Sequence, residues 1–322
     1  MSSPRNKTIT AINGVRVGHY TDSEGGTGLT VVLFDEPFVG AADISGMATS
    51  TRQIDCLSLL HPGSMVHAVC FTGGSAFGLG AATGVSKYLE ENGVGLDMYV
   101  ARIPVVPTVA IYDLSFMSSS ARPGVSSAYE ACVAASSGPV EQGCIGAGTG
   151  ATAGKLRGVL GATKTGLGSD LVEGMNGVKV GAIVVANPFG DILDERGMII
   201  AGARDGNRFL DTRNAIRSGE VRKHAGSPGG NTTLCLVVTD AYLDKVGCKQ
   251  VARMASTGLA RHISPYNTPF DGDVVLCLSR GTIKVDILHL GVLASLAAEN
   301  ALMNAVQMAG SMGGLPCSKD FQ

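Results

Sequence analysis

The composition of this sequence changes abruptly at Asn231, and this change limits the folds that the chain can adopt. Residues 224–230 are His-Ala-Gly-Ser-Pro-Gly-Gly, a segment with little side-chain packing and a backbone that takes many conformations. Thr232 then opens an apolar, β-branched run, and Thr-Leu-Cys-Leu-Val-Val-Thr over 233–239 has the composition and length of a buried strand. The sequence therefore predicts a pliable loop that leads directly into a core strand.

This junction has two interpretations. A long hairpin loop that enters a strand is the commoner one, and the local sequence alone favours it. A threonine at the first position of a core strand, behind a pliable loop, is also where a self-cleaving hydrolase would keep its nucleophile. The rest of the chain decides between them.

The composition limits the class of protein and its partners but does not indicate a function. The 322 residues are 45% hydrophobic and only 16% charged, with 45 Gly, as in a globular chain of one large domain or two ordinary ones. The net charge of −2 argues against nucleic-acid partners, and no apolar run reaches the roughly 18 residues that span a membrane. The N-terminal segment has no apolar signal-peptide region, so we expect a cytoplasmic protein. So little charge favours burial of apolar surface between subunits.

Cysteine and histidine give no sign of a metal site. The 8 cysteines lie mostly inside apolar runs, without a Cys-x-x-Cys motif, and the 6 histidines are dispersed. We expect free, buried thiols in a reducing compartment, and no metal or other cofactor.

The glycine-rich segment 145–155 is a false lead for nucleotide binding. A phosphate-binding loop needs Gly at position 149 and Ser or Thr after the lysine, whereas this chain has Thr149 and Leu156. A dinucleotide fingerprint also fails, because no clear strand precedes Gly146. Lys155 can still face a substrate, although a solvated surface lysine is the simpler interpretation of that residue alone.

Strand-like and helix-like segments alternate along the chain, which indicates an α/β protein. We expect Ser75 to cap a helix that runs through 85–91 and ends at Gly93, and residues 203–230 to form an exposed connecting loop. The other expected elements are strands at 66–71, 178–187 and 274–278, and helices at 126–137, 244–260 and 286–309. The last helix is almost wholly apolar but is interrupted by His289, Glu299 and Asn300, so we expect it in the core or at an interface.

Two polar motifs flank the expected strands. Asn187 opens an Asn-Pro-Phe-Gly-Asp turn that ends at Asp191, either a hairpin tip or a bend; its amide could donate to an oxyanion or simply bond its own turn. Asp271 and Asp273, separated by Gly272, would point to the same side of an extended strand entrance. Such a pair suits an ammonium or a hydroxyl, although Asp-Gly-Asp is also ordinary turn chemistry.

Taken together, several segments resemble one family, the self-processing aminopeptidases of the DmpA type. This family includes L-aminopeptidase/D-amino-acid esterases, β-peptidyl aminopeptidases and nylon-oligomer hydrolases. The segments occur in the family's order and cover nearly the whole chain: Gly73-Gly-Ser-Ala-Phe-Gly-Leu, Val109-Ala-Ile-Tyr-Asp-Leu, Asn187-x-x-Gly-Asp191, Gly230-Asn-Thr-Thr and Asp271-Gly-Asp273. The resemblance implies an α/β fold, a four-layer α-β-β-α sandwich of the N-terminal-nucleophile-like (DmpA/ArgJ-like) type. It also implies a single domain, 1–322, that cuts itself once.

The resemblance implies a cut between Asn231 and Thr232, which would give a large chain of residues 1–231 and a small chain of residues 232–322. Thr232 would then be the nucleophile. Asp271 and Asp273 match the Asp-x-Asp pair of the threonine-type members, and this places the chain nearer to the nylon-oligomer hydrolases.

The remaining site residues are also carried over from the family. Asn187 and Lys155 match its oxyanion-hole asparagine and active-site lysine, and Tyr112 aligns with a tyrosine of the substrate pocket. The implied reaction is hydrolysis of amide or ester bonds in small amine-bearing peptides or oligomers, through an acyl group on Thr232 and without a cofactor. The new α-amine of Thr232, with an ordinary pKa of about 7.7–8.0, can act as the base. The family also implies a homo-oligomer, a tetramer of cleaved protomers.

Two alternatives remain. An acyltransferase of the ornithine-acetyltransferase type has a similar sandwich, but it cuts at an Ala-Thr junction, whereas this chain has Gly-Asn-Thr-Thr from Gly230. An uncleaved, non-catalytic binding protein is the other, and it is disfavoured because every expected active-site residue type is present.

Overall fold

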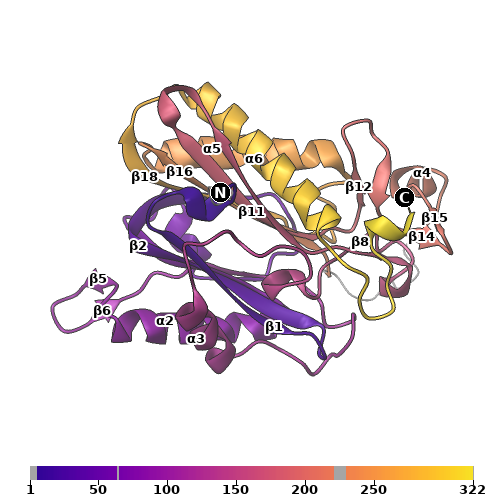
Figure 1. Ribbon diagram of the computed structural model, residues 1–322, viewed down its shortest axis with the longest axis horizontal. Helices are drawn as coiled ribbons and strands as arrows, with labels where there is room; N and C mark the ends of the chain where they lie inside the picture. Colours follow the sequence, from indigo (N-terminus) through magenta and orange to yellow (C-terminus); the bar gives the residue numbers. More distant parts are fainter. Residues whose placement is uncertain (1–5, 64, 221–229, 322) are drawn as a thin grey trace, which may run out of the picture.

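The computed structural model describes residues 6–63, 65–220 and 230–321 (Figure 1). The pliable loop predicted at 224–230 therefore lies, except for Gly230, outside the described residues. The six α-helices of the described chain are α1 (Ser75–Gly78), α2 (Ala82–Glu91), α3 (Val125–Ala134), α4 (Thr212–Arg217), α5 (Lys245–His262) and α6 (Ile287–Gln307).

A nine-stranded sheet forms the centre of the molecule, in the order β10-β11-β16-β18-β2-β4-β7-β3, with β1 also paired to β2. Its strands are β1 (Val15–Asp22), β2 (Thr27–Ile44), β3 (Thr51–Arg52), β4 (Met65–Thr72), β7 (Thr108–Ala110), β10 (Leu167–Glu173), β11 (Lys179–Asn187), β16 (Thr232–Ala241) and β18 (Val274–Ile283). The smaller sheets contain β5 (Leu96–Asp97) with β6 (Arg102–Ile103), β8 (Thr152–Ala153) with β9 (Thr163–Lys164), β14 (Arg204–Asp205) with β15 (Arg208–Phe209), and β12 (Asp191–Leu193) between β13 (Ile199–Ala201) and β17 (Ile263–Ser264).

The long strand β2 belongs to both halves of the large sheet. Its first part, around Leu29–Leu33, pairs with β4, and its last part, Val39–Ile44, pairs with β18. The register shifts between Leu33 and Phe38, which marks the point where the strand passes from one half to the other.

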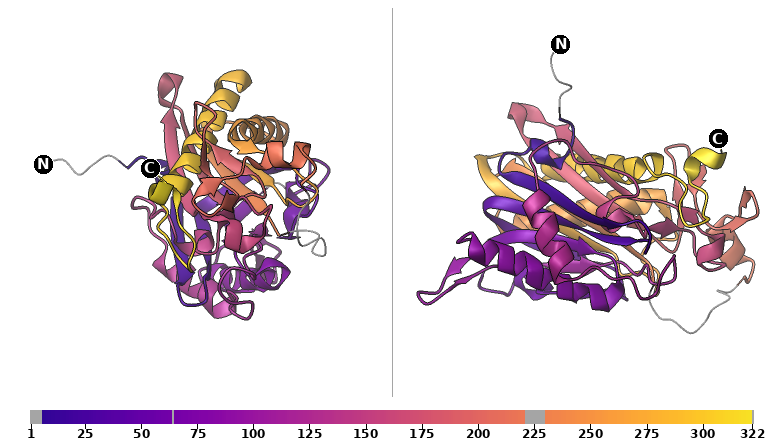
Figure 2. Two further views of the ribbon diagram at one scale, coloured as in Figure 1. Left: turned by 90° about the vertical axis from the view of Figure 1, so that its right-hand side faces the viewer. Right: turned by 60° about the horizontal axis from the view of Figure 1, so that its bottom comes forward.

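Side-chain alternation along the strands divides most of the interior of the described chain into three large cores, and a fourth, small cluster contains Leu156, Phe189 and Ala203. Along β16, Leu234, Leu236 and Val238 pack between the two halves of the sheet, whereas Cys235 and Val237 pack toward α5 and α6. Along β2, Val32 joins the central core and Val31 packs toward α2 and α3. The layers are thus helices, sheet, sheet, helices (Figure 2), and the predicted four-layer α-β-β-α sandwich is confirmed.

The predicted long helices are confirmed as α5 and α6, and each begins behind an aspartate whose side chain accepts from the first turn. Among the described helices, α6 is the one that is long and apolar enough to cross a membrane, and 50% of that window is buried inside the protein. It packs against α5, β10 and β11, the expected position of a core helix.

Two predictions of local structure were wrong or incomplete, and the structure decides a third that had left two alternatives open. Ser75 does not cap the helix: it lies inside the short helix α1 with a φ of 55°, behind Gly74, and α2 starts only at Ala82. The Asn187–Asp191 turn is a bend between two different sheets and not a hairpin tip. Much of 203–220 is ordered as β14, β15 and α4, because the buried Asp191 carboxylate accepts from the backbone N–H and hydroxyl of Thr212.

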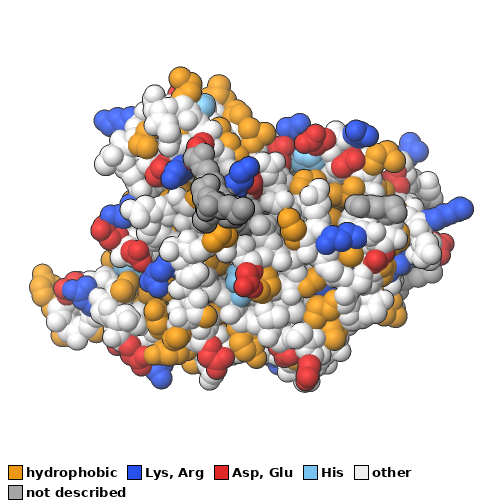
Figure 3. Space-filling model, in the orientation of Figure 1, with side chains coloured by type: hydrophobic (Ala, Val, Ile, Leu, Met, Phe, Trp, Pro, Cys, Tyr) orange, Lys and Arg blue, Asp and Glu red, His pale blue; other side chains and the backbone are white. Residues whose placement is uncertain are grey.

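The described face in Figure 3 carries scattered charges with apolar side chains between them, which agrees with the low charge content. The β5–β6 hairpin projects from the body of the molecule (Figure 1), and at its tip Tyr99 and Val100 are almost wholly exposed.

Candidate active site

Thr232 is the first residue of β16, and it lies opposite Asn187, the last residue of the neighbouring strand β11. The side chain of Thr232 is only 3% exposed. Its hydroxyl donates to the carbonyl oxygen of Asn231. The predicted nucleophile therefore lies against the peptide group that joins it to Asn231.

The same carbonyl oxygen accepts a second hydrogen bond. The backbone N–H of Gly272 donates to the carbonyl oxygen of Asn231 over 2.9 Å, and Asn231 forms a parallel bridge with Asp271. A Cβ at Gly272 would lie 2.6 Å from the carbonyl oxygen of Ala48 and 3.0 Å from the hydroxyl of Thr232. Close packing thus requires a glycine at position 272, and its N–H bonds to Asn231. The sequence analysis predicted neither.

Asp271 ties the motif to the end of strand β11. Its Oδ1 accepts from the backbone N–H of Phe189 over 2.9 Å, and its Oδ2 accepts from the backbone N–H and hydroxyl of Thr268, at 3.2 and 2.5 Å. Asp271 therefore fixes the Asp-Gly-Asp strand entrance against the bend that follows Asn187.

Asp273 ties the motif to the strand that carries Thr232. Its Oδ1 accepts from the backbone N–H of Thr233 over 2.6 Å, and its Oδ2 accepts from that of Asn267 over 3.3 Å. In the part of the chain that the structure describes, neither carboxylate bonds to Thr232 itself. The predicted contacts with the hydroxyl and the ammonium of Thr232 remain predictions for the cleaved protein, in which that ammonium would first exist.

Burial raises the pKa of both carboxyl groups, because the charged form loses its hydration. The pKa of Asp273 rises to about 7, first through burial and then through the nearby charge of Asp271. A buried carboxyl with a pKa of about 7, beside a second carboxyl whose pKa is also raised, fits a site that holds or transfers a proton.

Lys155 is buried, so its interpretation as a solvated surface lysine was wrong. Its Nζ donates to the side-chain Oδ1 of Asn187 over 2.8 Å and to the carbonyl oxygens of Thr152, Asn187 and Pro188 at 2.7–3.2 Å. The glycine-rich segment of the sequence therefore delivers an ammonium group to the end of β11, next to the residue that pairs with Thr232.

These contacts determine which way the Asn187 amide faces. Its Oδ1 accepts from Lys155 and from the backbone N–H of Thr152 at 3.1 Å, and both groups can only donate. The Nδ2 group therefore faces the other way, 3.5 Å from the carbonyl oxygen of Tyr112. Among the described contacts, the side chain of Asn187 does not bond its own turn, and its Nδ2 donor is directed toward the carbonyl oxygen of Tyr112.

Tyr112 enters this network through its backbone, and its side chain is half-buried. The next residue, Asp113, is buried and accepts from the hydroxyl of Thr27 over 2.6 Å and from the backbone N–H of Gly74 over 2.7 Å. The motif at Gly73 and the Tyr-Asp motif thus meet at Asp113, a residue that the sequence analysis did not single out.

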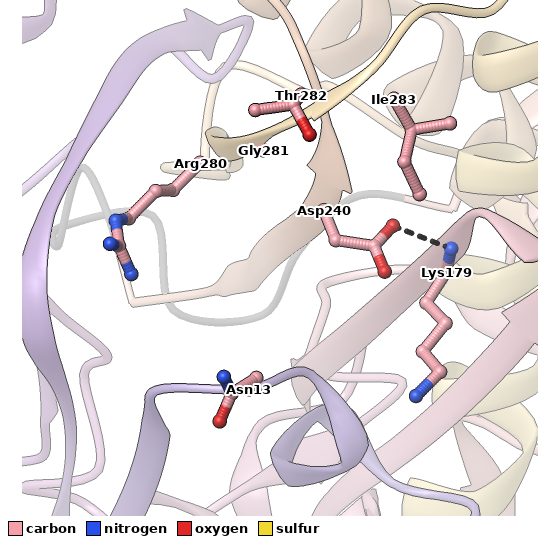
Figure 4. Close-up of a pocket in the computed structure, with 7 residues that line it drawn as sticks. All are labelled: Asn13, Lys179, Asp240, Arg280, Gly281, Thr282 and Ile283. Atoms are coloured by element: carbon pink, nitrogen blue, oxygen red, sulfur yellow. Dashed lines mark hydrogen bonds between the residues drawn. The ribbon is translucent and has the colours of Figure 1, made fainter.

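A hollow lies at the far end of the same strands, away from Thr232. Its volume is about 420 Å³, and Asp240 and Arg280 line it together with Lys179, whose backbone N–H donates to Asp240 over 2.7 Å (Figure 4). At about 3.4 Å per residue, Asp240 lies about 27 Å along β16 from Thr232. This hollow is separate from the Thr232 site. Among the described residues, no group of three or more His, Cys, Asp or Glu side chains could hold a metal ion.

Comparison with known proteins decides the family. The family model described as peptidase family S58 matches residues 7–318. The chain belongs to peptidase family S58. This S58 chain is thus a hydrolase of peptide or amide bonds, as predicted.

Relatives and solved structures agree with this assignment. The S58 chain is 36% identical to an uncharacterised aminopeptidase of Mycobacterium leprae (strain TN), over 98% of this chain and 94% of that one. It is 30% identical to the 6-aminohexanoate-oligomer endohydrolase of Kocuria sp. (strain KY2), over 91% and 84%. The structure of an L-aminopeptidase D-Ala-esterase/amidase from Ochrobactrum anthropi, described as a variant of the Ntn hydrolase fold, superposes with a TM-score of 0.73 at 19% identity, over 98% of this chain and 91% of that one. That likeness confirms the fold predicted from the sequence.

Proposed function

We propose that this S58 hydrolase cuts itself between Asn231 and Thr232, and that Thr232 then hydrolyses amide or ester bonds. The observation that carries the proposal is the position of the Thr232 hydroxyl against the carbonyl of Asn231, whose oxygen also accepts from Gly272. A nucleophile, the carbonyl it would attack and a donor to the developing oxyanion are thus together in one uncut chain.

Self-cleavage would proceed as an N→O acyl shift. The Thr232 oxygen attacks the carbonyl carbon of Asn231, the C–N bond breaks, and the hydroxyl proton ends on the departing nitrogen. The N–H of Gly272 stabilises the oxyanion that forms on the way. Water then opens the ester, which leaves a carboxylate on Asn231 and a free α-amine on Thr232, at the ends of chains 1–231 and 232–322 of one domain.

Hydrolysis of substrate would use the α-amine of Thr232 that cleavage sets free, together with the buried polar groups around it. The α-amine of Thr232 takes the proton from its own hydroxyl, as an unprotonated amine with a pKa near neutral can. Nδ2 of Asn187, supported by Lys155, donates to the oxyanion on the substrate carbonyl. Asp271 and Asp273 orient the ammonium and hydroxyl of Thr232, and Tyr112 contributes to the substrate pocket.

We infer that the substrates are small peptides, oligomers, amides or esters that carry an amine. The names of two relatives, an aminopeptidase and a 6-aminohexanoate-oligomer endohydrolase, support this class. We further propose a homo-oligomer, a tetramer of cleaved protomers, which the low charge content and the exposed apolar tip of the β5–β6 hairpin support. A cytoplasmic location is supported by 8 unpaired cysteines, of which all but Cys144 are buried.

The proposal is tested by intact mass of the freshly purified protein beside two variants. We expect the wild type to give chains of 231 and 91 residues (322 − 231 = 91), and Thr232→Ala to remain one chain without hydrolytic activity. Thr233→Val is the matched control, because Thr233 is the next residue of the same strand and equally buried. It should still be cut. A Thr232→Ala protein that is cut, or that hydrolyses substrate at the wild-type rate, would show that Thr232 is not the nucleophile.

A further inference from the structure

We propose that Lys164, a second buried lysine that has no part in the site described above, is a positioning residue for the side chain of Asn187. The inference rests on the proposed function, in which Asn187 stabilises the oxyanion of the substrate. It adds a residue that acts on the reaction without touching substrate.

Lys164 is fully buried, and its environment is built for an ammonium group. Its Nζ donates to the carbonyl oxygens of Gly148, Ala151 and Thr165, at 3.2, 2.9 and 2.5 Å. These three acceptors match the three N–H groups of a charged lysine. A buried charge is costly even when it is fully hydrogen-bonded, because the ammonium loses its hydration. The charge at this position therefore calls for an explanation beyond packing.

The link from Lys164 to Asn187 is a single peptide group. Lys164 holds the carbonyl of the peptide between Ala151 and Thr152, and the N–H of that same peptide donates to Oδ1 of Asn187 over 3.1 Å. Because a peptide group is planar, fixing the direction of its carbonyl fixes the direction of its N–H. A positive charge on the oxygen also polarises the N–H and strengthens its hydrogen bond.

The segment that carries Lys164 also holds the backbone next to Asn187. Lys164 lies directly opposite Thr152 in the β8–β9 pair. The hydroxyl of the next residue, Thr165, donates over 2.5 Å to the carbonyl oxygen of Ala186, the residue before Asn187. Residues 164 and 165 thus hold both the donor to the Asn187 side chain and the backbone from which that side chain projects.

Loss of the Lys164 charge would leave the Asn187 amide less constrained. Oδ1 would keep its bond from Lys155, and the Ala151 carbonyl would keep its bond from the backbone N–H of Thr165 at 3.2 Å. The Thr152 N–H would lose the polarisation and the part of the restraint that the Lys164 ammonium supplies. The amide could then rotate, and its Nδ2 would spend less time where an oxyanion forms. The expected consequence is a loss of kcat, with little change in KM, because ground-state binding of substrate does not depend on this donor.

The first test compares Lys164→Met with Thr163→Val in the mature enzyme, with the p-nitroanilide of a small amino acid as substrate. Thr163 is also fully buried in β9, and its hydroxyl both donates to and accepts from the backbone of Gly202, without a link to Asn187. We expect Lys164→Met to lose kcat roughly ten- to a hundredfold, a part of what removal of an oxyanion donor costs, with KM within about twofold. Thr163→Val should keep kcat within about twofold at temperatures well below its melting point. Equal losses of kcat in Lys164→Met and Thr163→Val, or an unchanged kcat in Lys164→Met, would overturn the proposal.

A double-mutant cycle with Asn187→Ala separates positioning from general destabilisation. If Lys164 acts through Asn187, Lys164→Met should lower kcat less than about twofold in the Asn187→Ala background. If Lys164 has an independent structural effect, the kcat losses of the two single variants should multiply in the double variant. A double variant whose kcat loss equals the product of the two single losses overturns the proposal. Lys164→Gln, which keeps two N–H donors, serves in the same cycle if the Met variant does not fold. Failure of the proposed function would appear elsewhere, in a Thr232→Ala protein that still hydrolyses substrate.

Discussion

The two ends of strand β16 carry similar kinds of side chain in opposite surroundings. At the Thr232 end, Asp271, Asp273 and Lys155 are buried, and each is held by several hydrogen bonds from or to the backbone. At the other end, Asp240 and Lys179 are only half-buried beside an open hollow. Charge next to water costs little, whereas buried charge is kept only where specific partners hold it. The protein thus bears the cost of desolvating charged groups at the end of β16 that we propose to be reactive.

The largest expected difference between the two ends concerns their glycines. Gly272→Ala would force a Cβ against the carbonyl oxygen of Ala48 and move the N–H away from Asn231, so we expect self-cleavage to slow about a hundredfold or more. Gly281→Ala is the control at the far end, where a Cβ would lie 1.5 Å from the carbonyl oxygen of Asp240. It should lower the melting temperature but leave cleavage intact at 25 °C. The time course of chain masses measures both, and rapid cleavage of Gly272→Ala would contradict the role of that N–H.

The next difference concerns the lysines. Lys155→Met removes four hydrogen bonds around Asn187, and we expect a loss of kcat of about a hundredfold in whatever fraction matures. Lys179→Met removes one bond from a half-buried Nζ to the carbonyl oxygen of Ala11, so kcat should stay within about twofold. Steady-state kinetics measure kcat in both variants, after circular dichroism has shown that each variant is folded. Similar kcat losses in both variants would show that the two ends do not differ in this respect.

The carboxylates predict a pH dependence of stability in the uncut chain. Because the folded pKa of Asp273 is raised to about 7, above its unfolded value of about 3.9, the folded state binds more protons than the unfolded state between these values. The stability of the uncut Thr232→Ala protein should therefore be highest at low pH with respect to this group, and fall as pH rises from about 4 to 7. Asp273→Asn in the same background should remove most of that fall, whereas Asp240→Asn should not. Urea unfolding across this pH range measures the effect, and an unchanged slope in Asp273→Asn would contradict the assignment.

The smallest expected effect is that of Tyr112→Phe. Tyr112 meets Asn187 through its carbonyl oxygen, which the substitution leaves in place, so self-cleavage should not change. A role of the side chain in the substrate pocket predicts a KM higher by a few fold with kcat nearly unchanged. Kinetics with the same p-nitroanilide would show this. A large fall in kcat would instead place the hydroxyl among the groups that act on the transition state.

Much of the architecture of this protein can be predicted from its sequence. The apolar run from Thr232 predicted the central strand, the helices at 244–260 and 286–309 followed from their apolar patterns, and the order of the motifs indicated the family and its sandwich. These features are local, or depend on short spacings, and a single sequence contains them in full.

Which polar residues share one environment depends on the tertiary structure and could not be predicted. Lys155 looked like a surface lysine and Lys164 drew no attention, yet both are buried, because carbonyl groups from separate segments converge on each ammonium. Gly272 looked like turn chemistry until its N–H was found on the carbonyl of Asn231, some forty positions earlier in the chain. The physical reason is the same in each case. Burial and partnership of a polar group are set by segments far apart in sequence, and no local pattern records them.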